Sequence, residues 1–253
     1  LRCITMQAVS SALLKTIKEL QALPSLSKFA LAGGTNLALR FDHRISEDID
    51  LFATEIIGIK GFENIEADVK AFYSNNVINI IYPVKENDQF VFIRFFIKKG
   101  DVTIKVDIIQ NMKALYPFET IKAVRCYNVI DLGLFKLVSC SNRPAKKDIY
   151  DLEYITESNN LIDLYNLLKE KKAKFSKDTD RNIFDLDEDP DPIDNPHLLL
   201  LFDKRMATRQ KMRHSHDNIL TIEGSKSWRE ASMYWRMKVR RLYASIGIEY
   251  PKL

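Results

Sequence analysis

The chain has 253 residues and a formal net charge of +4, and 46% of its residues are hydrophobic and 28% charged. This composition is typical of a globular protein and excludes a wholly disordered chain, a fibrous protein and a coiled-coil rod. No apolar run approaches the roughly 20 residues of a membrane-spanning helix and no secretory signal is recognised, so we expect no membrane partner.

The first half of the chain predicts a mixture of helices and strands. A helical pattern over residues 7–23 ends at Pro24, which cannot continue a helix. The further predicted elements are a strand over 28–32, a helix over 35–41, a strand over 48–52, a helix over 62–74, and strands over 77–84, 90–98 and 102–109. The last two strands are joined by Gly100-Asp101, a pair typical of hairpin turns.

The second half predicts helices. Their apolar spacing covers residues 130–140, 146–156 and 161–172. The Asp/Pro-rich stretch 185–196 predicts a linker or an exposed loop. From residue 197 the pattern is helical again, with one apolar stripe formed by Trp228, Ala231, Trp235, Val239 and Leu242. The predicted fold class is therefore α+β, with an α/β core over residues 1–128 followed by a helical part over residues 129–253.

The cysteines and histidines offer little metal or redox chemistry. Cys3, Cys126 and Cys140 are far apart and form no Cys-x-x-Cys motif, which favours a reducing, cytoplasmic location over a disulfide framework or a zinc ribbon. The pair His214-x-His216 lacks a well-placed third ligand, so we interpret it as part of a solvated loop.

Two carboxylates, Asp48 and Asp50, flank the apolar Ile49 on a predicted strand, so both point to the same face. Like charges this close repel unless a cation neutralises them, and Mg²⁺ prefers carboxylate oxygens. A third carboxylate, Asp107, lies on the predicted strand 102–109. If the two strands are neighbours, the three carboxylates can hold one or two metal ions.

A glycine pair stands between the first predicted strand and the helix that follows it. Gly33 and Gly34 let backbone N–H groups approach a phosphate without a side chain in the way. Thr35 either adds a hydroxyl donor or caps the helix. Glycines for phosphate and carboxylates for Mg²⁺ together indicate a nucleoside triphosphate site.

The run Gly33-Gly34-Thr35, followed by Arg44-x-Ser46-x-Asp48-x-Asp50, resembles the signature of the DNA polymerase beta-like nucleotidyltransferase superfamily. More closely, it resembles the AbiEii/AbiGii group, the toxin component of type IV toxin–antitoxin and abortive-infection systems. Asn36 stands where that group usually has a small residue. The expected core is therefore the mixed sheet of that superfamily.

Later residues strengthen the resemblance. Lys136, Arg143 and the run Lys146-Lys-Asp-Ile-Tyr-Asp-Leu152 are similar to the late motifs of the same group, in the same order. The matches run from about residue 30 to residue 152, and the last hundred residues match no motif.

The resemblance implies roles for the early residues. Asp48 and Asp50 would bind Mg²⁺, or Mn²⁺ in its place, and thereby hold the triphosphate. Asp107 would complete the metal site and help to deprotonate the acceptor hydroxyl. The residues of the glycine turn, Gly33, Gly34 and Thr35, would contact the phosphates. Arg44 and Ser46 would lie at the nucleotide site, or alternatively pair with the acids or cap a turn.

The resemblance also implies roles for the late residues. Lys136 would reach the nucleotide phosphates, supported by Arg143. Either Asp148 or Asp151 would lie near the nucleotide or orient Lys136; the two are three residues apart on one helix face, so the alternative stays open. In the implied reaction an acceptor hydroxyl attacks the α-phosphate and releases pyrophosphate.

Charge distribution bears on the acceptor. Residues 184–194 hold six acids and no base, whereas residues 197–253 hold twelve Lys/Arg against five Asp/Glu. The basic part suits a polyanion. We therefore expect an RNA acceptor, such as a tRNA 3′ end, with a cognate antitoxin as partner. The alternatives are a small hydroxyl compound resembling an aminoglycoside, a protein hydroxyl, or a non-catalytic nucleotide- or RNA-binding module.

Overall fold

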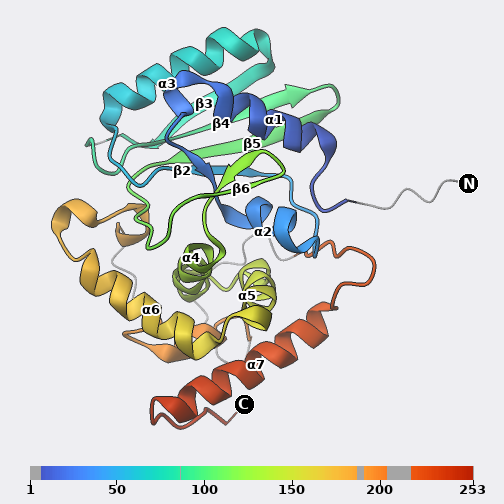
Figure 1. Cartoon of the computed structure of the whole chain (residues 1–253), viewed down its shortest axis with the longest axis vertical. Coiled ribbons are helices and arrows are strands. Elements are labelled where there is room, and N and C mark those ends of the chain that lie inside the picture. Colours follow the sequence, from blue (N-terminus) through green and yellow to red (C-terminus); the bar gives the residue numbers. More distant parts are fainter. Residues whose placement is uncertain (1–6, 86, 187–190, 204–217, 253) are drawn as a thin grey trace, which may run out of the picture. The chain divides into compact units, whose positions relative to one another are not determined.

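The computed structural model describes residues 7–85, 87–186, 191–203 and 218–252 (Figure 1). Cys3 and the His214-x-His216 pair lie outside these residues. The chain divides into two compact units. The first comprises Leu1–Asn128 and Lys177–Ile183, and the second Val129–Ser176 and Phe184–Leu253.

The first unit is built on a seven-stranded mixed sheet with the strand order β3-β4-β5-β2-β1-β7-β6. The strands are β1 (Ala30–Leu31), β2 (Ile49–Phe52), β3 (Val77–Val84), β4 (Phe92–Lys99), β5 (Val102–Ile109), β6 (Glu119–Ile121) and β7 (Val124–Cys126). Strand β2 runs parallel to β5 and antiparallel to β1, and β1 runs parallel to β7. The α+β fold class predicted from the sequence is confirmed.

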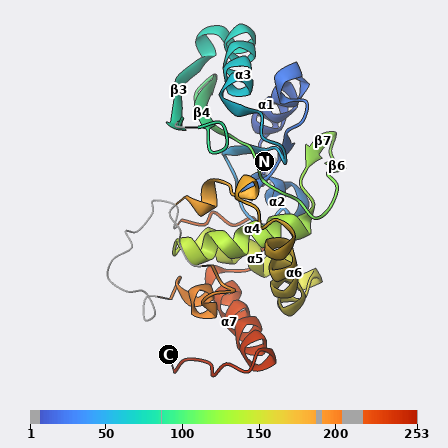
Figure 2. The same ribbon diagram turned by 90° about the vertical axis from the view of Figure 1, so that its left-hand side faces the viewer.

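Three α-helices accompany this sheet: α1 (Ser11–Ala22), α2 (Gly33–Phe41) and α3 (Gly58–Tyr73). Helix α1 contacts β7, α2 contacts β2, and α3 contacts β3 and β4. Figures 1 and 2 both show α1 and α3 side by side along the sheet. Short 3-10 helices cover Pro24–Leu26 and Ser74–Asn76.

The hairpin of β4 and β5 follows from alternating side chains and one glycine. Inward residues such as Phe95 and Val106, which are register partners, are fully buried, while their neighbours along each strand are more exposed. Gly100 has a φ of +63°, the left-handed conformation that the turn requires. The predicted hairpin at Gly100-Asp101 is confirmed.

A second hairpin, β6 and β7, was not predicted. Its turn places Lys122 and Ala123 at φ values of +49° and +59°, where hairpins normally use Asn or Gly. The sequence therefore lacks the usual turn signal. Cys126 ends β7 and, like Cys140 of the second unit, is a buried free thiol.

The segment Lys177–Ile183 belongs to the first unit because polar side chains hold its backbone. Asn111 Nδ2 donates to the carbonyl oxygens of Thr179 at 3.0 Å and Arg181 at 2.6 Å. Gln89 Nε2 donates to the carbonyl oxygens of Asp178 at 2.5 Å and Arg181 at 2.9 Å. Apolar periodicity does not predict hydrogen bonds of this kind, so the return of this segment to the first unit is not predictable from the sequence pattern.

The second unit is helical. It consists of α4 (Val129–Asn142), α5 (Lys146–Ser158), α6 (Leu161–Lys174), α7 (Trp228–Ser245) and a 3-10 helix over Pro196–Leu200. The 3-10 helix Asp178–Asp180 belongs to the first unit, and the 3-10 helix Ile183–Asp185 begins at the last residue of that unit's second segment. Helix α5 packs on α4 and α7, and α6 packs on both α4 and α7. Within the described part of the chain, no helix has the length and apolar character needed to cross a membrane.

Four of the five residues of the predicted apolar stripe of α7 are buried, whereas Trp228, the first residue of the helix, is only half-buried. Ala231, Trp235, Val239 and Leu242 are fully buried, and Trp235 Nε1 donates to the carbonyl oxygen of Leu199 at 3.0 Å. A satisfied indole N–H is what a buried tryptophan requires. These four residues are therefore part of the core of the second unit.

Candidate active site

The three carboxylates predicted to act together lie on neighbouring strands. Strand β2 pairs in parallel with β5, and Asp50 and Asp107 are direct register partners. Asp48 immediately precedes β2, and continuing the same register places it beside Lys105. Ile49 is fully buried on the opposite face of β2. The strands are therefore neighbours, as the metal-site hypothesis requires.

Asp107 is buried and held by two cations of the sheet. Arg94 of β4, its register partner, donates from Nε to Oδ1 at 2.6 Å and from Nη2 to Oδ2 at 2.9 Å. Lys105 Nζ lies 3.2 Å from Oδ2 of Asp107 and 3.9 Å from Oδ2 of Asp48. The hydrogen bonds to Asp107 raise the pKa of the Arg94 guanidinium, and the charges of Asp50 and Asp48 raise it further.

The carboxylates do not form a closed metal cage. Among the described residues no group of three His, Cys, Asp or Glu side chains is arranged to hold a metal ion. A physical reason is that both oxygens of Asp107 accept hydrogen bonds from Arg94. Mg²⁺ is usually bound by one or two carboxylates together with substrate phosphates rather than by an all-protein cage. Asp48 and Asp50, with Asp107 beside them, therefore fit an ion that arrives with a nucleotide.

The glycine turn is shaped by two side chains that pack on it. Gly33 has a φ of +59°, and a Cβ placed there would stand 1.9 Å from Oδ2 of Asp50. A Cβ on Gly34 would stand 2.2 Å from Nη2 of Arg44. Both glycines lie in the first turn of α2, so the helix begins two residues before the predicted start at Thr35. The turn thus brings Asp50 and Arg44 against the backbone at the helix N-terminus.

Replacing Gly33 with alanine is expected to displace Asp50 and lower activity at least roughly tenfold, because the new methyl group overlaps its carboxylate. The left-handed φ adds strain of about 1–2 kcal/mol. Gly100→Ala is the matched control, since Gly100 has a φ of +63° and nothing lies within 4 Å of its Cβ position. Turnover and thermal unfolding of both variants separate the two effects. Equal activity in both would contradict the proposed importance of the turn.

Thr35 and Ser46 support the segment that carries Asp48. The two hydroxyl oxygens lie 2.8 Å apart, and Thr35 also donates to the carbonyl oxygen of Asp48. Both side chains are buried. The structure thus joins the Thr35 hydroxyl to Ser46 and to the backbone of Asp48. Its contact with a nucleotide phosphate remains a proposal.

The contacts of the Asn36 side chain account for an asparagine where the family usually has a small residue. Its Nδ2 donates to the carbonyl oxygens of Leu31 at 2.7 Å and Tyr127 at 3.1 Å, and its Oδ1 accepts from Arg40 Nε at 2.7 Å. The amide is fully buried. It therefore joins α2 to the ends of β1 and β7, beside the glycine turn.

The late motif residues form an ion-pair cluster in the second unit. Lys136 of α4 lies 2.6 Å from Oδ1 of Asp148 and 2.8 Å from Oδ2 of Asp151, both on α5. Arg143 Nε donates to Oδ2 of Asp148 at 2.8 Å. Burial alone would raise the pKa of Asp148, but the charges of Lys136 and Arg143 outweigh it and hold the pKa below its usual value. Both Asp148 and Asp151 therefore contact Lys136.

The comparison with protein families decides the identity of this arrangement. The family described as nucleotidyl transferase AbiEii toxin, of a type IV toxin–antitoxin system, matches residues 17–232. The chain belongs to the AbiEii family. It is therefore a nucleotidyltransferase of a toxin family, as the glycine turn and carboxylates suggested.

Individual proteins similar to this chain were also found. The uncharacterized protein aq_aa25 of Aquifex aeolicus (strain VF5) is 24% identical over 159 residues, which cover 62% of this chain and 72% of that protein. The structure of MenT4, a nucleotidyltransferase toxin from Mycobacterium tuberculosis H37Rv, superimposes with a TM-score of 0.52 at 14% identity, covering 94% of this chain and 85% of that chain. This likeness shows a shared fold. JHP933 from Helicobacter pylori gives a TM-score of 0.48 at 17% identity, covering 94% and 95% of the two chains.

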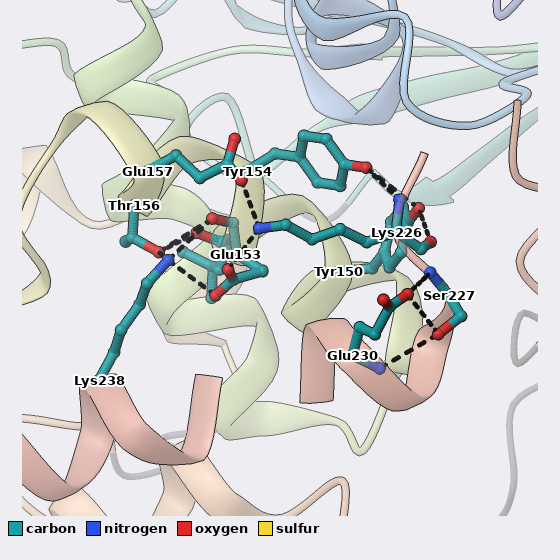
Figure 3. A network of polar contacts seen from close by, with 10 residues as sticks. Tyr150, Glu153, Tyr154, Thr156, Glu157, Lys226, Ser227, Glu230 and Lys238 are labelled. Carbon is teal, nitrogen blue, oxygen red and sulfur yellow. Dashed lines mark hydrogen bonds and ion pairs between the residues drawn. The ribbon is translucent and has the colours of Figure 1, made fainter. Parts of the chain in front are cut away.

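In this AbiEii-family chain a second ion-pair network anchors α7 to α5 (Figure 3). The buried carboxylate of Glu153 pairs with two lysines: its Oε1 lies 2.8 Å from Nζ of Lys226, and its Oε2 lies 2.7 Å from Nζ of Lys238. Burial lowers the pKa of Lys238, against the opposing effect of Glu153. Tyr150 donates to the carbonyl oxygen of Lys226, and the hydroxyl of Tyr154 accepts from its backbone N–H. These lysines therefore stabilise the second unit from within.

The basic residues of α7 divide into two groups. Arg236 donates to Asp203 at 2.9 Å and stacks over Phe202, and Lys238 pairs with Glu153. Carboxylates of the same unit therefore hold these two residues. Three α7 arginines are exposed: Arg229, Arg240 and Arg241.

Proposed function

We propose that this nucleotidyltransferase transfers a nucleotide from a nucleoside triphosphate to an acceptor hydroxyl on RNA, such as a tRNA 3′ end, in a reaction that depends on Mg²⁺ or Mn²⁺. The observation that carries the proposal is the pairing of Asp50 with Asp107 on parallel strands, next to the Gly33 turn and Asp48. Such carboxylates beside a helix N-terminus suit a triphosphate with its divalent ion.

Asp48 and Asp50 would hold the divalent ion with Asp107 beside them, and the bound ion would neutralise charge on the triphosphate. The acceptor oxygen forms a bond to the α-phosphorus while the bond to the β-phosphate oxygen breaks, so that pyrophosphate leaves and the hydroxyl proton passes to solvent. The residues of the site contribute chiefly by positioning the reactants and balancing charge. Asp107, whose oxygens both accept from Arg94, is better suited to positioning than to proton abstraction.

The remaining site assignments are part of the same proposal. Gly33, Gly34 and Thr35 approach the phosphates from the start of α2, with Arg44 packed on Gly34. Lys136 supplies positive charge for the nucleotide, and within the second unit Asp148 and Asp151 hold its ammonium while Arg143 pairs with Asp148. A cognate antitoxin is the partner that membership of a type IV toxin–antitoxin family supports.

A transfer assay tests this function. The purified protein is incubated with Mg²⁺, total cellular RNA and each α-labelled nucleoside triphosphate in turn, with Asp48→Asn as the inactive control. Label in RNA with the wild type alone would support the proposal and name the nucleotide. Label in protein, or in an added aminoglycoside, would show that the acceptor is not RNA but that protein or small molecule. No label in any acceptor would contradict the proposal.

The exposed arginines of α7 give a prediction for RNA binding. Changing Arg229, Arg240 and Arg241 to Gln together is expected to weaken RNA binding and to reduce the slope of log affinity against log salt by about 2, because each phosphate contact releases a counterion. Filter binding at several salt concentrations measures both. The control changes three exposed lysines of the first unit, Lys15, Lys18 and Lys60, to Gln. An equal loss of RNA affinity in this control would show that only the net charge of the protein matters.

A further inference from the structure

The carboxylate cluster already contains a positive charge at the place where a divalent ion is expected. Lys105 Nζ lies between two carboxylates, 3.2 Å from Oδ2 of Asp107 and 3.9 Å from Oδ2 of Asp48. Lys105 stands two residues before Asp107 on the same face of β5, and the register of β2 and β5 places Asp48 beside it. The lysine therefore reaches both strands of the site.

Arg94 and Lys105 differ in how they hold Asp107. Arg94 makes two hydrogen bonds in a planar, bidentate arrangement, which fixes the orientation of the carboxylate. Lys105 makes longer contacts through a compact ammonium on a flexible four-carbon stem. Both side chains are partly exposed, Arg94 at 35% and Lys105 at 27%, so the difference lies in the contacts: the bidentate pair of Arg94 is harder to break than the longer contacts of Lys105.

A divalent ion and the Lys105 ammonium cannot share the space between Asp48 and Asp107. Mg²⁺ takes oxygen ligands at about 2.0–2.1 Å, so an ion bound to Asp48 beside Asp107 would need the space that Lys105 Nζ occupies between these carboxylates. The two positive charges would also repel at this short distance. Binding of the ion therefore requires the lysine to leave, and the phosphates of an incoming nucleotide offer its ammonium a new anionic partner.

We propose that Lys105 is the resident cation of the nucleotide-free site, which excludes divalent ions until a triphosphate arrives and draws the ammonium from the carboxylates to its phosphates. The inference rests on the proposed function, since it assumes that Asp48 and Asp107 face the metal ion. It implies an order of binding, in which the ion enters together with the nucleotide and Lys105 changes its partner from carboxylate to phosphate.

Mn²⁺ binding without nucleotide tests the exclusion. The loss of the free Mn²⁺ paramagnetic resonance signal is followed as wild type, Lys105→Met, Lys105→Gln and Lys105→Arg are added. Both neutral variants are expected to bind Mn²⁺ roughly tenfold more tightly than wild type, since a repelling charge has been removed, while Lys105→Arg stays within about twofold. Lys98→Met is the matched control, because Lys98 is an exposed lysine on neighbouring β4, and its expected change is less than about twofold.

Tripolyphosphate tests the change of partner without assuming a base preference. In the presence of Mn²⁺, wild type is expected to bind tripolyphosphate several-fold more tightly than Lys105→Met or Lys105→Gln, the reverse of the order for Mn²⁺ alone. Circular dichroism verifies the fold of each variant, and having two neutral variants keeps the test valid if one is unstable.

Neutral variants that bind Mn²⁺ no more tightly than wild type would overturn the inference. The transfer assay on the same wild-type preparation separates the two proposals. Transfer to RNA without a gain in Mn²⁺ affinity in the variants would reject the role of Lys105 and leave the function standing. A gain in Mn²⁺ affinity in the neutral variants with no transfer by wild type would support the placement of Lys105 and reject the function.

Discussion

Asp48→Asn is expected to reduce nucleotidyl transfer by roughly 10³-fold or more, because the substitution removes one of the carboxylates proposed to hold the divalent ion beside the triphosphate. The fold should be little affected. Asp48 is 45% exposed and its contact with Lys105 is a long one, at 3.9 Å, so the ion pair contributes about 0–1 kcal/mol to stability. Initial rates with α-labelled nucleotide and thermal unfolding of the same preparation measure the two quantities.

Asp101→Asn is the matched control for this variant. Asp101 is an exposed aspartate in the turn between β4 and β5, so the same chemical change is made in the same unit outside the carboxylate cluster. Asp50→Asn should lose activity like Asp48→Asn, since Asp50 is the register partner of Asp107. Full activity of Asp48→Asn or Asp50→Asn would contradict the proposal that these carboxylates hold the divalent ion.

Period-two alternation and one turn signal were enough to predict the centre of the sheet. Asp48 and Asp50 on one face of a strand, with Ile49 on the other, depend only on the geometry of a strand. The adjacency of β2 and β5 was a condition of the hypothesis, and the strand pairing meets it. The position of the glycine turn was also predicted correctly. In the structure the side chains of Asp50 and Arg44 pack against the backbone of its two glycines.

The cations of the site were harder to predict because their role depends on pairing between strands. Arg94 is an isolated charge between buried Ile93 and Phe95, a pattern that marks an unusual position without naming its partner. Only the register of β4 and β5 identifies that partner as Asp107. The strand pattern alone places Lys105 on the same face of β5 as Asp107. Its contact with Asp48 becomes visible only when the pairing of β5 with β2 is known.

Lys136→Ala is expected to destabilise the protein by about 3–5 kcal/mol, because it removes the ammonium that neutralises two buried carboxylates. Asp148 and Asp151 have side chains that are 1% and 0% exposed, and Lys136 contacts them at 2.6 and 2.8 Å. Arg143 still pairs with Asp148, at 2.8 Å. Urea unfolding measures the loss, and Lys169→Ala, at an exposed position of α6, should stay within about 0.5 kcal/mol of wild type.

A double variant separates the structural from the catalytic contribution of Lys136. Lys136→Met with Asp151→Asn removes one charge of each sign, so Arg143 and Asp148 remain a balanced pair and much of the stability should return. If Lys136 also acts on the nucleotide, this variant should be folded and still inactive. A folded double variant with wild-type turnover would show that Lys136 serves the fold alone, because positive charge at that position would then be dispensable for transfer.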